Sequence, residues 1–293
     1  MYDQPKELFK DSPLTFDKGV ACTDVITLRA AAQAIAQYLP SHRVLLPDVA
    51  RDEIPMFFED LTHISVNPLI PKVTAVIDTK KMAWNVPSEP TKTTFTDYTG
   101  EERQGVHFPV TSMEDIDDTY VMNLGVKLFD DRRALLWFAE LSDESELEGM
   151  RTYDLFKLAK ILMRDYANKE ESILRRPTIP AQQIDYERSL DEIIAINPQL
   201  KAIVQKAQIA IDYTGARVSV LTMMLGGKSP KPEEIKDIVF GARGPVLFWL
   251  TEDTLLNTFK EGKVVPADIT PFAVVATTAE AWLDPNRSVE FDY

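Results

Sequence analysis

The amino-acid sequence predicts an α+β fold, with mixed and antiparallel β-sheets and helices packed around them. Nineteen prolines against eleven glycines are spread along the 293 residues, which indicates many short strands and rigid connections rather than a helical bundle. Segments whose apolar residues recur at helical spacing alternate along the chain with short runs of apolar residues. A hydrophobic content of 45% is enough for a large core, and no Gly/Ser linker divides the chain. We therefore predict one domain, residues 1–293.

The N-terminal part of the chain, residues 1–62, predicts helices and a strand. Apolar residues recur at helical spacing over 24–39, and Asp24 is suited to cap the start of this helix. A short strand follows at 43–46. A second helix is expected from Asp48, although Pro55 interrupts its pattern.

The sheets are expected within residues 72–293, beginning with a strand at 72–80. Residues 93–95 and 105–110 predict successive strands around the polar turn DYTGEE. Residues 120–129 and 134–141 flank a charged turn and predict a β-hairpin.

A second well-defined helix is predicted at 152–166 from five apolar residues at helical spacing. Strand signals return at 173–185, and a short helix is expected at 189–195. The last strands are predicted at 246–250 and 271–283. The first of these is almost wholly apolar, as expected of a strand buried on both faces.

A long polar segment separates a strand that ends near Gly215 from the strand at 246–250. This segment, 215–243, contains several Pro, Gly and Lys residues. A hairpin between paired strands closes in two to five residues, so the segment is much longer than its connection requires. We therefore predict an exposed loop with a function of its own.

The charge of the chain limits its partners. The net charge is −14 and the isoelectric point is about 4.8, which argues against nucleic acid and is compatible with a basic protein or peptide. Two acidic clusters are predicted as solvated loops and not as calcium sites, because neither has the required spacing of ligands with a turn glycine. They comprise Glu114, Asp115, Asp117 and Asp118, and Asp143, Glu144, Glu146 and Glu148.

Cysteine content and hydropathy indicate where the protein functions. Cys22 is the only cysteine, so no disulfide can form within the chain. The sequence has no visible signal peptide and no run of eighteen uncharged apolar residues. These observations favour an intracellular protein without a membrane segment.

The sequence predicts no catalytic residue, metal site or cofactor. His42, His63 and His107 lie far apart and form no ligand-spaced pair. Cys22 is expected to be a structural thiol. The segment LGGKS at 225–229 lacks the first glycine of a phosphate-binding loop, and prolines follow it. We therefore expect a protein that is not an enzyme.

Six segments in order resemble the serpin family. One contains Trp84 and runs KMAWNVPSEPTKTTFTDYTGEERQGVHFPV, and another is the hairpin LGVKLFDDRRALLWFAEL. The others are RRPTIPAQQIDYERSLDEIIA, QKAQIAIDYTG, RGPVLFWL and FAVVATTAEAWLDPN. The resemblance covers most of the chain but skips a block of helices and two strands between residue 62 and Pro71.

The resemblance implies that the loop is of the reactive type. In inhibitory serpins a protease cleaves this loop, which then inserts into the central sheet and traps the protease. The hinge would lie at Gly215, Ala216 and Arg217. The cleaved region would contain Gly226, Gly227, Lys228 and Ser229, with the bond after Lys228 exposed to a trypsin-like protease.

Departures from the family pattern imply that trapping is lost. Insertion would place Arg217 in a packed sheet, where an unpaired charge is costly. Residues that let the sheet of the family open differ at the matching positions Pro47, Ala50, Val76 and Gln205. The sequence thus predicts a non-inhibitory protein that binds a partner protein through its loop.

Two alternatives stay open at this point. One is a functional inhibitor of serine or cysteine proteases that acts by loop cleavage and insertion. The other is a structural or assembly subunit that has reused the fold, with the loop and the extra stretch 254–270 as its interface. The second alternative includes self-association.

Overall fold

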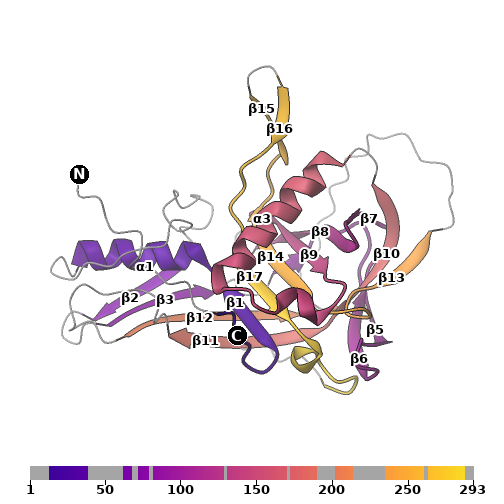
Figure 1. Ribbon diagram of the computed structural model, residues 1–293, viewed down its shortest axis with the longest axis horizontal. Helices are drawn as coiled ribbons and strands as arrows, with labels where there is room; N and C mark the ends of the chain where they lie inside the picture. Colours follow the sequence, from indigo (N-terminus) through magenta and orange to yellow (C-terminus); the bar gives the residue numbers. More distant parts are fainter. Residues whose placement is uncertain are drawn as a thin grey trace.

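Three β-sheets and two α-helices form the described part of the chain (Figure 1). The computed structural model describes nine ranges of residues, and all structural statements below refer to them. They are 13–38, 62–67, 72–78, 82–128, 131–169, 172–189, 202–213, 235–260 and 263–287. These ranges hold both α-helices and mostly antiparallel strands, so the α+β class is confirmed.

The largest sheet is antiparallel apart from one pairing. Its main path follows the order β1 (Val20–Thr23), β17 (Phe272–Thr277), β14 (Val246–Glu252), β9 (Arg133–Glu140), β8 (Thr119–Lys127), β7 (Thr111–Ile116), β10 (Ile173–Pro180), β6 (Glu102–His107) and β5 (Thr91–Thr96). The short strand β4 (Ala83–Trp84) pairs with β8. Strand β13 (Lys236–Val239) pairs with β10 in parallel.

Strand β14 lies at the centre of the hydrophobic core, between β9 and β17. Its residues from Val246 to Thr251 are all buried, which confirms the predicted strand buried on both faces. Trp249 lies opposite Trp137 of β9, and the two rings stack with centroids 6.0 Å apart. The Nε1 of Trp137 donates a hydrogen bond to Oγ1 of Thr251 at 3.0 Å.

A second sheet of four strands positions the predicted loop. Its order is β11 (Gln182–Ser189), β12 (Ala202–Ile211), β3 (Lys72–Asp78) and β2 (Thr62–Asn67). The outer pairs are antiparallel, whereas β12 and β3 run in parallel. The predicted loop therefore begins at the end of a central strand of this sheet.

The two helices match the predicted ones. α1 (Val25–Tyr38) lies over the sheet of β2 and β3 (Figure 1), and Oδ2 of Asp24 caps it by accepting a hydrogen bond from the Thr27 amide at 2.7 Å. α3 (Thr152–Asn168) packs on the large sheet. Its buried face includes Leu155, Phe156, Ala159, Leu162 and Met163. None of the described helices is long and apolar enough to span a membrane.

Both predicted hairpins are confirmed. β5 and β6 pair around residues 97–101, where Gly100 has a φ of +90° that few other residues adopt. β8 and β9 pair in register from Tyr120 and Glu140 to Lys127 and Arg133.

Part of one acidic cluster differs from its prediction. Glu114 lies in β7 and is only 3% exposed, because the sequence extends a strand through residues expected to form a loop. Asp117 and Asp118 form the exposed turn that follows. Strands β1, β2, β4, β7 and β13 were not predicted, and neither were β15 (Asn257–Lys260) and β16 (Lys263–Pro266). Ser189 ends β11, and the rest of the predicted helix at 189–195 lies outside the described residues, as do the elements predicted at 43–46 and after Asp48.

Candidate functional site

The candidate site is the connection between β12 and β14, which includes β13. Its predicted hinge residues Gly215, Ala216 and Arg217 lie outside the described residues, as do Gly226, Gly227, Lys228 and Ser229. The last part of the predicted loop, residues 236–239, forms strand β13. The structure therefore describes the departure end of the connection, 211–213, and its return end, 240–243.

Trp84 holds the departure end. Its indole Nε1 donates a hydrogen bond of 2.9 Å to the carbonyl oxygen of Asp212. The Trp84 ring packs edge-on against Phe108, with centroids 4.8 Å apart. Ile211 and Asp212 are buried, whereas Tyr213 is exposed. The chain thus leaves the core at Tyr213.

The carboxylate of Glu140 holds the return end. Glu140 is 1% exposed, and its Oε1 accepts hydrogen bonds from the amides of Gly241 at 2.9 Å and Arg243 at 3.1 Å. Its Oε2 forms an ion pair of 2.9 Å with Nε of Arg243, whose guanidinium lies over the Tyr120 ring. Burial raises the pKa of Glu140, although the charge and hydrogen bonds of Arg243 act in the opposite direction.

Gly241 is required at the return end for steric reasons. Its φ is +90°, and a Cβ atom there would lie 2.7 Å from the ring of Trp282. The Tyr98 amide donates a hydrogen bond of 3.0 Å to the Gly241 carbonyl. The return end is therefore joined to the turn between β5 and β6.

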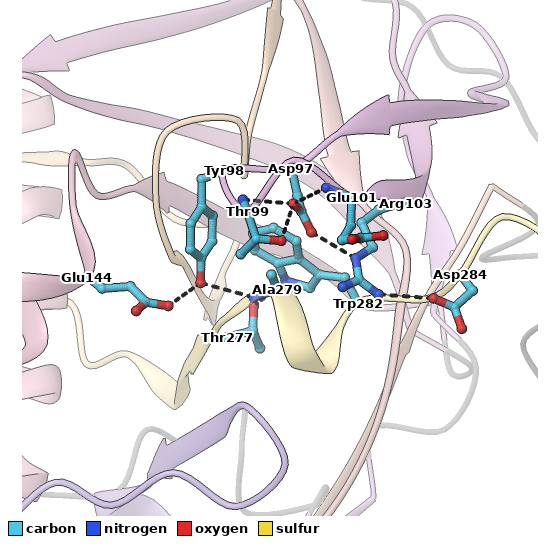
Figure 2. Close-up of polar contacts among 10 residues, drawn as sticks. All are labelled: Asp97, Tyr98, Thr99, Glu101, Arg103, Glu144, Thr277, Ala279, Trp282 and Asp284. Atoms are coloured by element: carbon cyan, nitrogen blue, oxygen red, sulfur yellow. Dashed lines mark hydrogen bonds and ion pairs between the residues drawn. The ribbon is translucent and has the colours of Figure 1, made fainter.

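That turn contains a network centred on the buried carboxylate of Asp97 (Figure 2). Its Oδ1 accepts hydrogen bonds from the amides of Thr99 and Glu101 and from the Thr99 hydroxyl, at 2.7 to 3.0 Å. Its Oδ2 pairs with Nε of Arg103 at 2.8 Å, and Arg103 also pairs with Asp284. Burial opposes ionisation of Asp97, but these bonds outweigh it and lower its pKa.

Tyr98 connects the same turn to two short 3-10 helices, η2 (Glu144–Leu147) and η3 (Ala279–Ala281). Its hydroxyl donates to the Glu144 carboxylate and accepts a hydrogen bond from the Ala279 amide at 3.2 Å (Figure 2). Burial and the bond to Glu144 raise the pKa of Tyr98. The hydroxyl is therefore a neutral donor near pH 7.

Replacing Asp97 with Asn is expected to destabilise the protein in a pH-dependent way. At pH 7 the free energy of unfolding should fall by about 1.5–3 kcal/mol, the usual value of a hydrogen bond to a charged group. Because the folded-state pKa of Asp97 is lowered, its contribution is complete above the unfolded value of 3.8 and is lost as the pH falls through the folded value. Urea unfolding at several pH values measures the difference, which should shrink in acid. A difference that stays constant down to the acid limit of folding would contradict this role.

The remaining candidates for chemistry are not brought together. Cys22 is buried in β1, and His107 contacts the Thr178 hydroxyl at 3.0 Å. His42 lies outside the described residues, and His63 lies in β2. Among the described residues, no group of three His, Cys, Asp or Glu could hold a metal ion. The described residues of the candidate site therefore fix the two ends of one connection.

Sequence analysis missed the residues at the return end. Glu140 was read as part of an apolar strand, and the function of Gly241 depends on Trp282, which is 41 positions away in the sequence. One signal was present: Glu140 is the only acid in the run LLWFAEL, which otherwise reads as a buried strand.

No family model and no curated protein matches the sequence. Among solved structures, the chain is similar to a thermophilic serpin, Tengpin, in its native state, with 11% identity and a TM-score of 0.41, covering 73% of this chain and 57% of that one. It is also similar to native protease nexin-1 with heparin, with 10% identity and a TM-score of 0.37, covering 87% of this chain and 67% of that one.

These two structures are serpins, and the likeness concerns the fold alone. The fold of this chain is α+β, as predicted, and its serpin-like character stays an expectation from the sequence resemblance. The chain spans only 57% of the length of the Tengpin structure. The activity and partners of this chain are therefore proposals.

Proposed function

We propose that this serpin-like chain is non-inhibitory and binds a partner protein through the segment 214–234. The observation that carries the proposal is that buried groups fix both ends of the connection: Trp84 at Asp212, and Glu140 at Gly241 and Arg243. Fixed ends reduce the conformational freedom that a binding segment loses when a partner orders it. A segment held in this way is suited to recognition.

The charge of the segment suggests the surface that it recognises. The segment 214–234 carries Arg217, Lys228 and Lys231 against Glu233 and Glu234, so it has a net charge of +1 in a chain with a net charge of −14. The apolar run VSVLTMML lies between the first two cations. A partner with an acidic and apolar recess, surrounded by a more basic surface, matches this distribution.

Protease inhibition is the second candidate, and the topology of the four-stranded sheet favours it. β12 and β3 are parallel, so a chain that leaves β12 and reverses direction would run antiparallel to both strands. Two observations favour the non-inhibitory function. β12 and β3 already pair from Ala202 and Lys72 to Gln208 and Asp78, and insertion would bury Arg217 on one face of the sheet at a cost on the order of several kcal/mol.

Cleavage of the segment distinguishes these two functions. We expect a trypsin-like protease to cut after Lys228 and to leave the melting temperature unchanged, with no complex that survives a denaturing gel. A Ser229→Pro variant, in which proline follows Lys228, is the matched control and should resist this cut. A covalent complex, or a large rise in melting temperature after cleavage, would mean that the segment inserts and that the protein is an inhibitor.

Partner binding is tested with a photo-reactive benzoylphenylalanine at position 228 and, as a control, at the exposed Lys92 of β5. Cross-linking in the native cell extract should give one discrete adduct from position 228 and none from position 92. The same adducts from both positions would show that the segment has no special affinity for a partner.

A further inference from the structure

A two-stranded arm extends beyond α3 and exposes apolar side chains. It consists of β15 (Asn257–Lys260) and β16 (Lys263–Pro266) and projects away from the sheets in Figure 1. Leu255 at its base is 82% exposed and Val264 is 68% exposed, while Ile161 on the adjacent helix α3 is 44% exposed. These three residues are among the most exposed large hydrophobic residues of the described chain.

The arm is fixed at its base but has open edges. The Ala267 amide bonds to the Leu256 carbonyl at 2.7 Å, and Lys160 of α3 pairs with Asp268 at 2.6 Å. Among the described strands, β15 and β16 pair only with each other. A two-stranded hairpin has marginal stability by itself, and its unpaired edges favour association with another chain.

The charge of this region is opposite to that of the rest of the molecule. We call the surface formed by α3 with Lys169 and by residues 254–270 the arm face. It has a net charge of +2, so the remainder of the chain carries −16. The cations are Lys157, Lys160, Arg164, Lys169, Lys260 and Lys263, and the acids are Asp154, Asp165, Glu261 and Asp268.

The strongest acidic counterpart lies at the other end of the molecule. The contacts of Tyr98 and Arg103 in Figure 2 bring together three stretches, 97–103, 143–148 and 280–284, which we call the acidic end. Arg103 is the single cation in these stretches. The exposed acids are Glu101, Glu102, Asp143, Glu144, Glu146, Glu148, Glu280 and Asp284.

The two strands of the arm cannot reach the acidic end within one molecule. α3 begins at Thr152, four residues after Glu148 of the acidic end, and the side chain of Asn257 contacts the Ala167 carbonyl near the other end of the helix. At 1.5 Å per residue, this helix of 17 residues separates the strands of the arm from the acidic end by about 25 Å. In Figure 1 the arm projects at the top and the β5–β6 hairpin lies at the bottom.

We propose that the arm face binds the acidic end of a second copy of this chain. The two surfaces are different patches, so the contact is heterologous and joins copies head to tail. Opposite charges bring the copies together, and burial of Leu255, Val264 and Ile161 stabilises the contact. This surface is separate from the segment 214–234, so the proposal does not depend on the proposed function.

Sedimentation velocity of the full chain, over a range of concentrations and salt, tests the proposal. We expect dimers or larger species at low salt and dissociation at 0.5 M salt, where charge attraction is largely screened. The double variant Leu255→Ser with Val264→Thr should lower the association constant about tenfold or more, which corresponds to 1.4 kcal/mol or more. Tyr38→Ser removes an exposed aromatic residue of α1 and should change nothing, so it is the matched control.

Charge reversal tests the head-to-tail geometry. One variant, Lys260→Glu with Lys263→Glu, and another, Glu148→Lys with Glu280→Lys, should each associate weakly by themselves. An equal mixture of the two should associate again, because the unchanged arm of the second variant fits the unchanged acidic end of the first. Melting temperatures close to that of the wild type would show that all variants are folded.

Two outcomes would overturn the proposal. One is a wild-type protein that stays monomeric up to roughly 1 mM, the concentration at which binding is worth about 4 kcal/mol. The other is an oligomer that neither the arm variants nor the charge reversals weaken. Failure here leaves the cleavage and cross-linking results at position 228 unaffected.

Discussion

Replacing Glu140 with Ala is expected to lower the free energy of unfolding by about 3–5 kcal/mol, as for other buried groups that lose a charged partner. The change removes the acceptor for the amides of Gly241 and Arg243 and leaves the Arg243 side chain without its ion pair. Urea unfolding at pH 7 measures the loss. Glu148→Ala removes an exposed carboxylate and should change stability by less than about 0.5 kcal/mol. Equal effects of the two changes would contradict the role of Glu140.

The contribution of Glu140 should also depend on pH. Burial raises its folded-state pKa above the ordinary value of 4.5, so the folded protein binds this proton more tightly than the unfolded chain does. Its contribution is then greatest below pH 4.5 and declines as the pH rises through the folded value. This direction is opposite to that of Asp97. The stability difference between the wild type and Glu140→Ala, measured across the same pH range, should therefore narrow towards higher pH.

The second large effect is expected in the core. Trp249→Ala should lower the free energy of unfolding by about 3–5 kcal/mol, because it leaves a cavity. The conservative changes make a sharper comparison. The indole nitrogen of Trp249 is buried and has no hydrogen-bond partner among the described residues, whereas Trp137 donates to Thr251. Trp249→Phe removes an unsatisfied donor, while Trp137→Phe breaks a buried bond that is worth about 1 kcal/mol.

We therefore expect Trp137→Phe to be the more destabilising of the two conservative variants. Thermal unfolding of the three variants beside the wild type measures the order. Both variants lose the same ring volume. The two residues also lie opposite each other in β9 and β14, so the comparison is closely matched. A Trp249→Phe protein that is less stable than Trp137→Phe would show that the indole nitrogen of Trp249 is satisfied in solution.

Local sequence patterns predicted the elements whose pattern is complete within a few residues. The helix at 152–166 was predicted because its buried face repeats along one segment, and β8 and β9 were predicted because their turn lies between two apolar runs. β7 pairs with its neighbour β8 and was missed because its acidic residues indicated a loop. β1 was missed because its burial comes from a distant partner. β1 is only four residues long and pairs with β17, more than 250 positions later.

The candidate site also divides into a residue that the local sequence indicated and residues whose partners are distant in the sequence. Trp84 was noted from its place in the serpin-like segment, and its bond to Asp212 spans 128 positions. Nothing near Glu140 in the sequence indicates that its partners follow a hundred positions later. Pairings of this kind are set by the order of strands in the sheet, which single-segment periodicity does not contain.

The pairing of β1 with β17 also affects how the chain is made. Val20 lies opposite Thr277, so the first described strand pairs with the last described strand. During synthesis β1 leaves the ribosome long before β17 has been made. One edge of β14 also has no partner strand until β17 is present. The large sheet can therefore close only after β17 has been synthesised. Until then its apolar strands are open to chaperones, and a chain that stops short of residue 272 should be recognised as incomplete.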